Sequence, residues 1–110
     1  MTYNAMRFIE TPIFTKQVQA LLADEEYKSL QIALLLRPEQ GAVMQGSGGL
    51  RKIRWAMKGS GKRGGLRVIY FWDSNAESFY MLYLYAKNKQ EDLTADQLKI
   101  LSRLVKEELA

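Results

Sequence analysis

Apolar and polar positions along the first part of the chain predict a strand followed by a helix. A partly apolar stretch at 6–9 indicates the strand. Thr11 and Pro12 come directly after it, a cap residue and a first helical residue in the order that helix starts favour. We expect the helix to reach about Leu22.

A second helix is predicted over residues 24–37. Asp24 is expected to cap it, and Glu25 and Glu26 follow in the first turn, where carboxylates interact favourably with the positive end of the helix dipole. Pro38 ends the helix, because the residue before a proline is disfavoured in helical conformation. Its apolar face is formed by Tyr27, Leu30, Ala33 and Leu34.

The polar stretch 39–49 is predicted to be a loop, and strands follow it. Residues 50–57 alternate in the manner of a half-buried strand. One side carries Ile53, Trp55 and Met57, and the other carries Lys52, Arg54 and Lys58. Residues 66–72 are rich in Val, Ile, Tyr and Phe, which favour strands, and 78–87 is apolar on both faces, as in a central strand.

A final helix is predicted to start at Thr94. Thr94 and Gln97 have the spacing of a capping box, and Leu93 and Leu98 occupy the two positions of a hydrophobic staple. An apolar stripe then follows at helical spacing, formed by Leu98, Leu101, Val105 and Leu109.

These elements predict one α+β domain over residues 1–110, with a small antiparallel sheet, two N-terminal helices on one sheet face and a C-terminal helix. We expect the other face to stay available. Side-chain parity places Lys52 and Arg54 on one face of their strand. Tyr83, Tyr85 and Lys87 share a face of another strand, and all converge if Arg67 points the same way.

Composition excludes several classes of function. The chain has no cysteine and no histidine, so it has no disulfide framework, no thiolate metal site and no histidine base. No acidic metal cluster stands out, and we expect neither a metal nor a cofactor. The longest apolar run, 79–86, is too short to span a bilayer. We therefore expect a cytoplasmic protein without a membrane partner.

Positive charge is concentrated between Gln40 and Trp72. This block holds seven of the 16 Lys and Arg residues and no Asp or Glu. Glycines interleave it, which lets the backbone approach a phosphate closely. The pattern indicates a nucleic-acid interface. The block contains Arg51, Lys52, Arg54, Lys58, Lys62, Arg63 and Arg67. Tyr83 and Tyr85 are explained most simply by packing, and Asp92 and Asp96 by charge near a helix end.

Three segments together resemble the HigB-like branch of the RelE/ParE toxin superfamily, over nearly the whole chain. They are residues 48–54, residues 61–71, and residues 85–88 with Asp92 and Leu93. The resemblance implies a toxin of a type II toxin–antitoxin pair that enters the ribosome and cuts mRNA without a metal. It also implies an antitoxin partner, usually with a helix-turn-helix DNA-binding domain.

The resemblance places the family's basic catalytic positions at Lys52, Arg54, Arg67 and Lys87, and the chemistry of the reaction adds Tyr85 to the candidate catalytic set. Lys52 beside Arg54 would be the base, because a neighbouring cation favours the free amine. Arg67 and Arg54 would hold the phosphate, and Lys87 or Tyr85 would stabilise or protonate the leaving group. Contacts to RNA or the ribosome are expected from Arg51, Lys58, Lys62, Arg63, Asn88 and Lys89.

Two other functions stay open on the sequence. A gyrase poison of the ParE type shares the fold but binds a protein target. A plain RNA-binding module would use the same cations only to grip phosphate. The group of Lys52, Arg54, Arg67 and Lys87 favours the ribonuclease over the gyrase poison.

Overall fold

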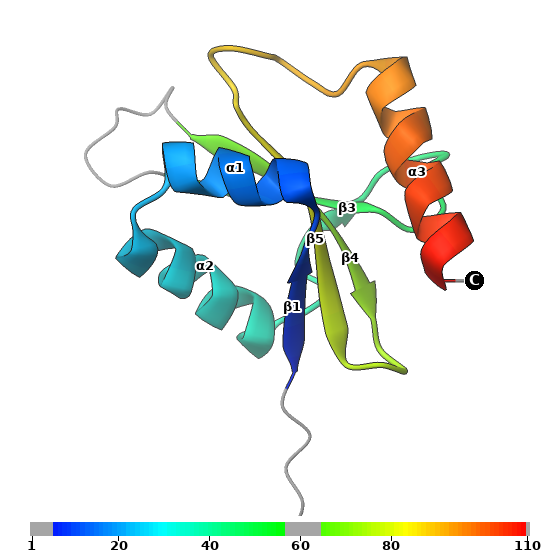
Figure 1. Ribbon diagram of the computed structural model, residues 1–110, viewed down its shortest axis with the longest axis horizontal. Helices are drawn as coiled ribbons and strands as arrows, with labels where there is room; N and C mark the ends of the chain where they lie inside the picture. The colour runs from blue at the N-terminus through cyan, green and yellow to red at the C-terminus, as the bar shows by residue number, and fades with distance from the viewer. Residues whose placement is uncertain (1–5, 57–64, 110) are drawn as a thin grey trace, which may run out of the picture.

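The structure is a computed structural model that describes residues 6–56 and 65–109. Its elements follow the predicted order, with one short strand added (Figure 1). The added strand, β2, lies in the stretch predicted to be a loop. In chain order the elements are β1 (Arg7–Glu10), α1 (Pro12–Leu21), α2 (Asp24–Leu36), β2 (Ala42–Val43), β3 (Arg51–Trp55), β4 (Leu66–Asp73), β5 (Ser78–Ala86) and α3 (Ala95–Leu109).

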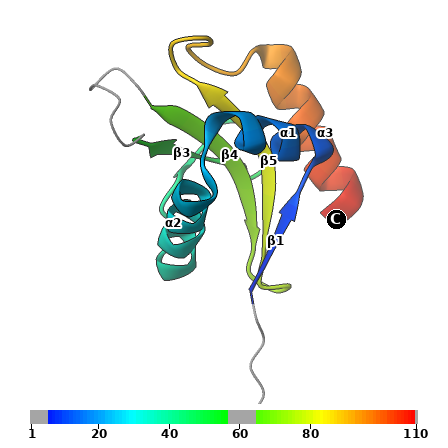
Figure 2. The same cartoon turned by 60° about the vertical axis from the view of Figure 1, so that its left-hand side comes forward.

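The strands form one mixed sheet in the order β1-β5-β4-β3-β2. Figure 2 shows β1, β5, β4 and β3 in this order across the sheet. β1 runs parallel to β5, which corrects the predicted all-antiparallel sheet, and the other neighbours are antiparallel. A parallel pair needs a long connection between its strands, and here everything from α1 to β4 lies in that connection. In this order β5, β4 and β3 occupy the interior of the sheet, and β1 and β2 form its edges.

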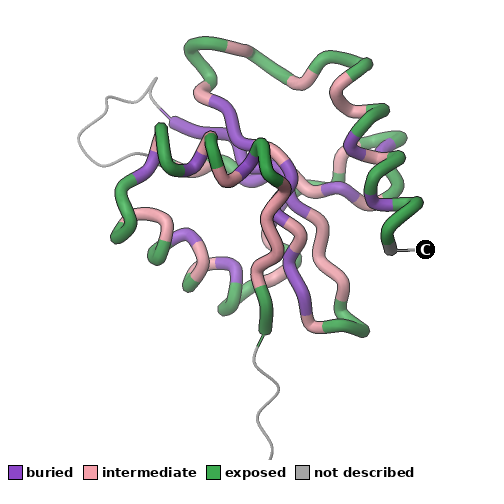
Figure 3. The backbone as a smooth tube through the Cα atoms, viewed as in Figure 1, coloured by how far each residue is buried: buried purple, intermediate pink, exposed green. Residues whose placement is uncertain are grey.

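Helices α1 and α2 cover one sheet face, as predicted. Thr11 caps α1, since its Oγ1 accepts a hydrogen bond from the N–H of Phe14 at 3.1 Å. The predicted cap of α2 is wrong by one residue: Ala23 holds the cap position without a side-chain bond, and Asp24 lies in the first turn. The core on this face contains Phe14, Val18, Leu30, Leu34, Tyr70 and Phe79. Figure 3 shows that buried positions alternate with exposed ones along both helices.

Helix α3 covers much of the second sheet face, which the sequence predicted to stay available. Its buried residues Leu101 and Val105 pack against a cluster that includes Leu50, Ile69 and Leu82. Its amphipathic stripe needed an apolar surface, and the first face was already occupied. α3 thus leaves open the end of this face where Arg54 and Arg67 lie.

The start of α3 is confirmed in detail. The N–H of Gln97 donates to Thr94 Oγ1 at 3.1 Å, and the N–H of Thr94 donates to Gln97 Oε1 at 3.0 Å. Leu93 and Leu98 both pack against the core of the second face. The capping box is therefore formed, and both residues of the predicted staple are packed against one core.

A bulge in β5 decides which of its side chains face each core. The register of β5 against β4 shifts between Ile69 and Tyr70, and Leu82 falls between their partners. An extra residue of this kind changes the alternation of a strand. Before the bulge the side chains facing α1 and α2 are Phe79 and Met81, and after it they are Leu84 and Ala86. The side chains facing the other way are Tyr80, Leu82, Tyr83 and Tyr85.

Candidate functional site

Side chains on the open end of the second face stand in two rows across β3, β4 and β5. In one row Arg54 pairs with Arg67, and Arg67 pairs with Tyr85. The next row consists of Lys52, Ile69 and Tyr83. Paired residues of antiparallel strands point to the same side of the sheet. The ladder thus brings together four predicted site residues, which we call the basic site: Lys52, Arg54, Arg67 and Tyr85.

Arg67 is a buried cation without an acidic partner in the described part of the chain. The residue is only 8% exposed. Within residues 6–56 and 65–109 its guanidinium makes one long hydrogen bond, from Nη1 to the carbonyl of Leu66 at 3.4 Å. Arg54 stands directly opposite, and like charges at paired positions destabilise a sheet. A buried charge held at this cost is suited to binding an anion.

Asp92 reaches the basic site from the segment between β5 and α3. Its Oδ1 accepts hydrogen bonds from Lys52 Nζ at 3.3 Å and from the Tyr85 hydroxyl at 3.5 Å. The N–H of Leu93 donates to the same oxygen at 2.9 Å. The sequence had explained Asp92 only as a charge near a helix end, so the structure adds a carboxylate that sequence reasoning missed.

The pKa of Asp92 is lowered and the pKa of Tyr85 is raised, and both shifts have causes within the site. Partial burial acts to raise the pKa of Asp92, but the N–H of Leu93 and the ammonium of Lys52 outweigh it, and the pKa is lowered. Burial, with the nearby Asp92 carboxylate, raises the pKa of Tyr85 to about 12, against the opposing effect of Arg67. Near neutral pH Asp92 is therefore ionised and Tyr85 keeps its proton.

The raised pKa of Tyr85 predicts a loss of stability in alkali. A group whose pKa is higher in the folded state contributes stability below its unfolded value of 10.0, and that contribution is lost as the pH passes about 12. We expect the free energy of unfolding, measured by urea denaturation, to fall between pH 10 and 12, and Tyr85→Phe to fall less steeply. Equal slopes for the two proteins would contradict the environment described for Tyr85.

Gln97 fixes the segment that carries Asp92 to the sheet. Its Oε1, which closes the capping box, also accepts from Gln90 Nε2 at 2.5 Å. Its Nε2 donates to the Tyr83 hydroxyl at 3.2 Å. One side chain thereby joins the start of α3 to the second row of the site.

Arg51 lies apart from the basic site. It pairs with Tyr70 of the first core, and its Nη1 donates to the carbonyls of Glu39 at 2.9 Å and Gly41 at 2.8 Å. Its charge is thus engaged by the connection between α2 and β2, on the opposite sheet face from Lys52.

The remaining predicted site residues fall into two groups. Lys87, Asn88 and Lys89 are exposed just after β5, and the N–H of Lys87 donates to the carbonyl of Gly65 at 3.1 Å. Lys58, Lys62 and Arg63 lie outside the described residues. Across the two described ranges, no group of three acidic side chains is placed to hold a metal ion.

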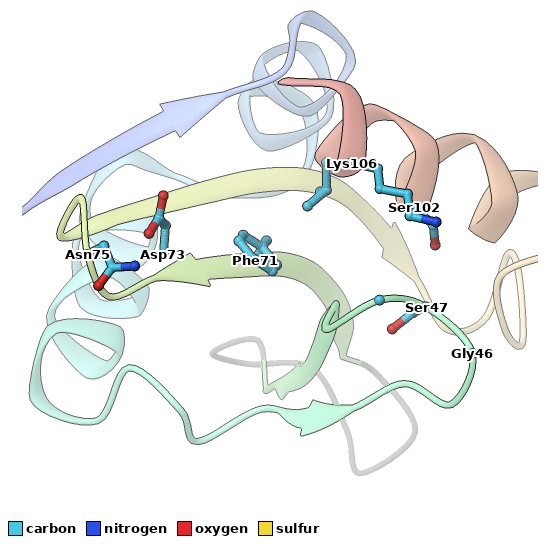
Figure 4. Close-up of a pocket in the computed structure, with 9 residues that line it drawn as sticks. Gly46, Ser47, Phe71, Asp73, Asn75, Ser102 and Lys106 are labelled. Carbon is cyan, nitrogen blue, oxygen red and sulfur yellow. The ribbon is translucent and has the colours of Figure 1, made fainter. Parts of the chain in front are cut away.

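A hollow of about 430 Å³ lies beside α3 on the second sheet face (Figure 4). It is bounded by α3, the segment before β3 and the turn after β4. Ser102 lines it, and the Oγ of Ser102 is buried without a hydrogen-bond partner among the described residues. Lys106 and Asp73 bring one charge of each sign, and none of its lining residues belongs to the basic site.

Comparisons with known proteins agree on one family and one fold. The family model described as "RelE toxin of RelE / RelB toxin-antitoxin system" matches residues 6–110. The structure of an arginine-to-alanine mutant of E. coli toxin RelE in the free state is similar in fold, with a TM-score of 0.61. The two share 17% sequence identity, and the match covers 96% of this chain and 100% of that chain. No helix in the described residues is long and apolar enough to cross a membrane.

Proposed function

The chain belongs to the RelE toxin family, and on this premise we propose that it is a ribosome-dependent endoribonuclease that cuts mRNA and inhibits translation. The observation that carries the proposal is the environment of Arg67. This residue is 8% exposed, lies beside Arg54 and has no carboxylate partner among the described residues. Two neighbouring arginines are suited to binding a phosphodiester. In RNA each phosphodiester lies next to a 2′-hydroxyl, which can act as the nucleophile.

The basic site can meet the charge requirements of this reaction. Attack by the 2′-hydroxyl builds negative charge on the phosphorus oxygens, and the guanidinium groups of Arg67 and Arg54 would bind those oxygens. The bond from phosphorus to the 5′-oxygen then breaks, and Tyr85 can donate a proton to that oxygen because it is protonated at neutral pH.

Lys52 is less suited to the role of base than the sequence indicated. The prediction relied on Arg54 to favour the free amine, but the carboxylate of Asp92 lies 3.3 Å from Lys52 Nζ and stabilises a positive charge there. Lys52 would then act as an ammonium that stabilises the charge of the transition state.

An antitoxin partner of the RelB type follows from the family. The proposal extends to its kind: the resemblance to the HigB-like branch favours a small antitoxin with a helix-turn-helix DNA-binding domain, encoded in the neighbouring reading frame. Its acidic residues would be attracted to the basic site.

Expression of this chain alone is expected to arrest growth by stopping protein synthesis. Primer extension on a translated message should show new 5′ ends within codons, and the same message without a start codon should stay intact. Co-expression of the antitoxin should restore growth.

Two results would contradict the proposal. If DNA synthesis stopped first while transcripts stayed intact, the gyrase poison would be the better explanation. If transcripts were protected but never cut, the chain would act as a plain RNA-binding module.

A further inference from the structure

We propose that Asp92 is the general base of the cleavage reaction and takes the proton of the attacking 2′-hydroxyl. This inference rests on the proposed endoribonuclease function. In the described part of the chain, Asp92 is the one carboxylate bonded to the basic site, through Lys52 and Tyr85. A base must lie within reach of the reacting hydroxyl, beside the groups that bind the phosphate.

The two oxygens of the Asp92 carboxylate are used differently. Oδ1 accepts all three hydrogen bonds described, from Lys52, Tyr85 and the N–H of Leu93. Oδ2 accepts none from the described residues. The side chain is 61% exposed, so Oδ2 is open to a ligand arriving at the basic site. The carboxylate is thus oriented through one oxygen and free to accept a proton at the other.

The backbone around Asp92 is well anchored. Leu93 packs against the core of the second face, and Gln90 Nε2 donates to the Asp92 carbonyl at 2.8 Å. Gln90 is itself bonded to Gln97 at the start of α3. Because several contacts fix this segment, the carboxylate keeps its position over the site without a bound ligand.

Each proton in the reaction has a place to go. The proton of the 2′-hydroxyl passes to Asp92 Oδ2, and the electron pair of the 2′-oxygen forms the new bond to phosphorus. The bond from phosphorus to the 5′-oxygen breaks, and that oxygen takes the electron pair of the bond and the proton of Tyr85. The products are a 2′,3′-cyclic phosphate and a 5′-hydroxyl.

The contact between Asp92 and Tyr85 also returns the site to its starting state. After cleavage Asp92 carries the proton that Tyr85 has lost, and the two side chains are direct hydrogen-bond partners at 3.5 Å. The proton on Oδ2 can therefore return to Tyr85 once the carboxyl group rotates, or by exchange with solvent at the exposed oxygen. The lowered pKa of Asp92 keeps it ionised and the raised pKa of Tyr85 keeps it protonated at neutral pH, which are the starting protonation states that a base and an acid need.

The dependence of the cleavage rate on pH separates Asp92 from Lys52 as the base. We would measure single-turnover cleavage of mRNA on programmed ribosomes from pH 6 to 9. With Asp92 as base and Tyr85 as acid the maximal rate should be nearly flat, whereas a required free amine would give a rise of about tenfold per pH unit. The charged or titratable groups around Asp92 are Lys52 and Arg54 on β3, Arg67 on β4, Tyr83 and Tyr85 on β5, Lys87 after it, and Glu91 in the same segment.

Asp92→Asn tests the role directly, with Glu91→Gln as the matched control. Asp92→Asn keeps the shape and the Oδ1 acceptor but should lower the maximal rate by about 100-fold or more, with the half-saturating toxin concentration unchanged or lower. Glu91→Gln removes the same charge one residue away and should cleave at the rate of the unmodified protein.

The possible outcomes separate this inference from the proposed function. If the unmodified protein leaves ribosome-bound mRNA intact, the endoribonuclease proposal fails, and the assignment of Asp92 fails with it. If it cleaves, then an Asp92→Asn rate equal to or above that of the unmodified protein, or a tenfold rise per pH unit, overturns only the assignment of Asp92. Should Asp92→Asn fail to fold, the pH dependence of the unmodified protein still decides.

Discussion

Replacing Arg67 by methionine is expected to abolish mRNA cleavage without destabilising the fold. The loss of a donor that binds transition-state charge lowers rates by about 100- to 1,000-fold. Methionine retains much of the side-chain volume and removes a buried positive charge that faces Arg54 and has no acidic partner in the described residues. The free energy of unfolding should therefore stay level or rise.

Both properties of Arg67→Met can be measured on one preparation. Cleavage on programmed ribosomes gives the rate, and urea denaturation gives the free energy of unfolding. Arg103→Met, at an exposed position of α3, serves as the control for losing one arginine. A stable Arg67→Met protein that still cut mRNA would refute the assignment of Arg67, and a loss of several kcal/mol of stability would refute the description of its burial.

Replacing Phe79 by alanine is expected to lower the free energy of unfolding by about 3–5 kcal/mol, which is the usual cost of removing a large aromatic ring from a core. Phe79 is fully buried, and its ring contacts three aromatic neighbours. Its centroid lies 4.4 Å from that of Trp72, 4.8 Å from that of Phe8 and 6.1 Å from that of Tyr70. Few of these rings can collapse into the space left.

Phe71→Ala is the matched control for Phe79→Ala. Phe71 lies on the neighbouring strand, is only half-buried and borders the hollow beside α3, so its removal leaves less unfilled core. Urea denaturation of both variants should show a clearly larger loss for Phe79. Equal losses would mean that the two sheet faces contribute alike, contrary to the packing described.

Local signals in the sequence were sufficient to locate most elements. Thr11-Pro12 and the Thr94/Gln97 box each concern residues within one turn, and the structure confirms both helix starts. Ala23 holds the cap position of α2 although Asp24 has the better side chain for it, and it directly follows Leu22, the C-cap residue of α1. Two-residue β2 had too few residues to give an alternating pattern.

Features that depend on distant residues were not predictable in the same way. The parallel pairing of β1 with β5 joins Arg7 to Ser78, and nothing in either segment specifies its neighbour. The position of α3 depends on which sheet face the earlier helices leave free. The sequence shows that α3 needs an apolar surface but not which one.

The basic site was predictable only in part, because some of its residues are neighbours along one strand and others come together only in the folded sheet. Parity along β3 placed Lys52 and Arg54 together, and the observed register adds Arg67 and Tyr85 to them. Asp92 was missed because its place over the sheet follows from the packing of α3. One signal was available in the sequence. Asp92 is distant from Lys52 along the chain, but it lies just before a helix that must fold back onto the sheet.

The bulge at Leu82 reverses, between the two halves of β5, which alternate positions face α1 and α2. Up to Met81 the odd-numbered residues belong to the core under α1 and α2, and from Leu84 onward the even-numbered residues do. If the same sequence alternated without the bulge, Tyr83 and Tyr85 would turn toward α1 and α2 and Leu84 would turn toward the basic site. The orientation of both tyrosines toward the basic site therefore depends on Leu82, the one residue in this part of β5 that has no partner in the ladder.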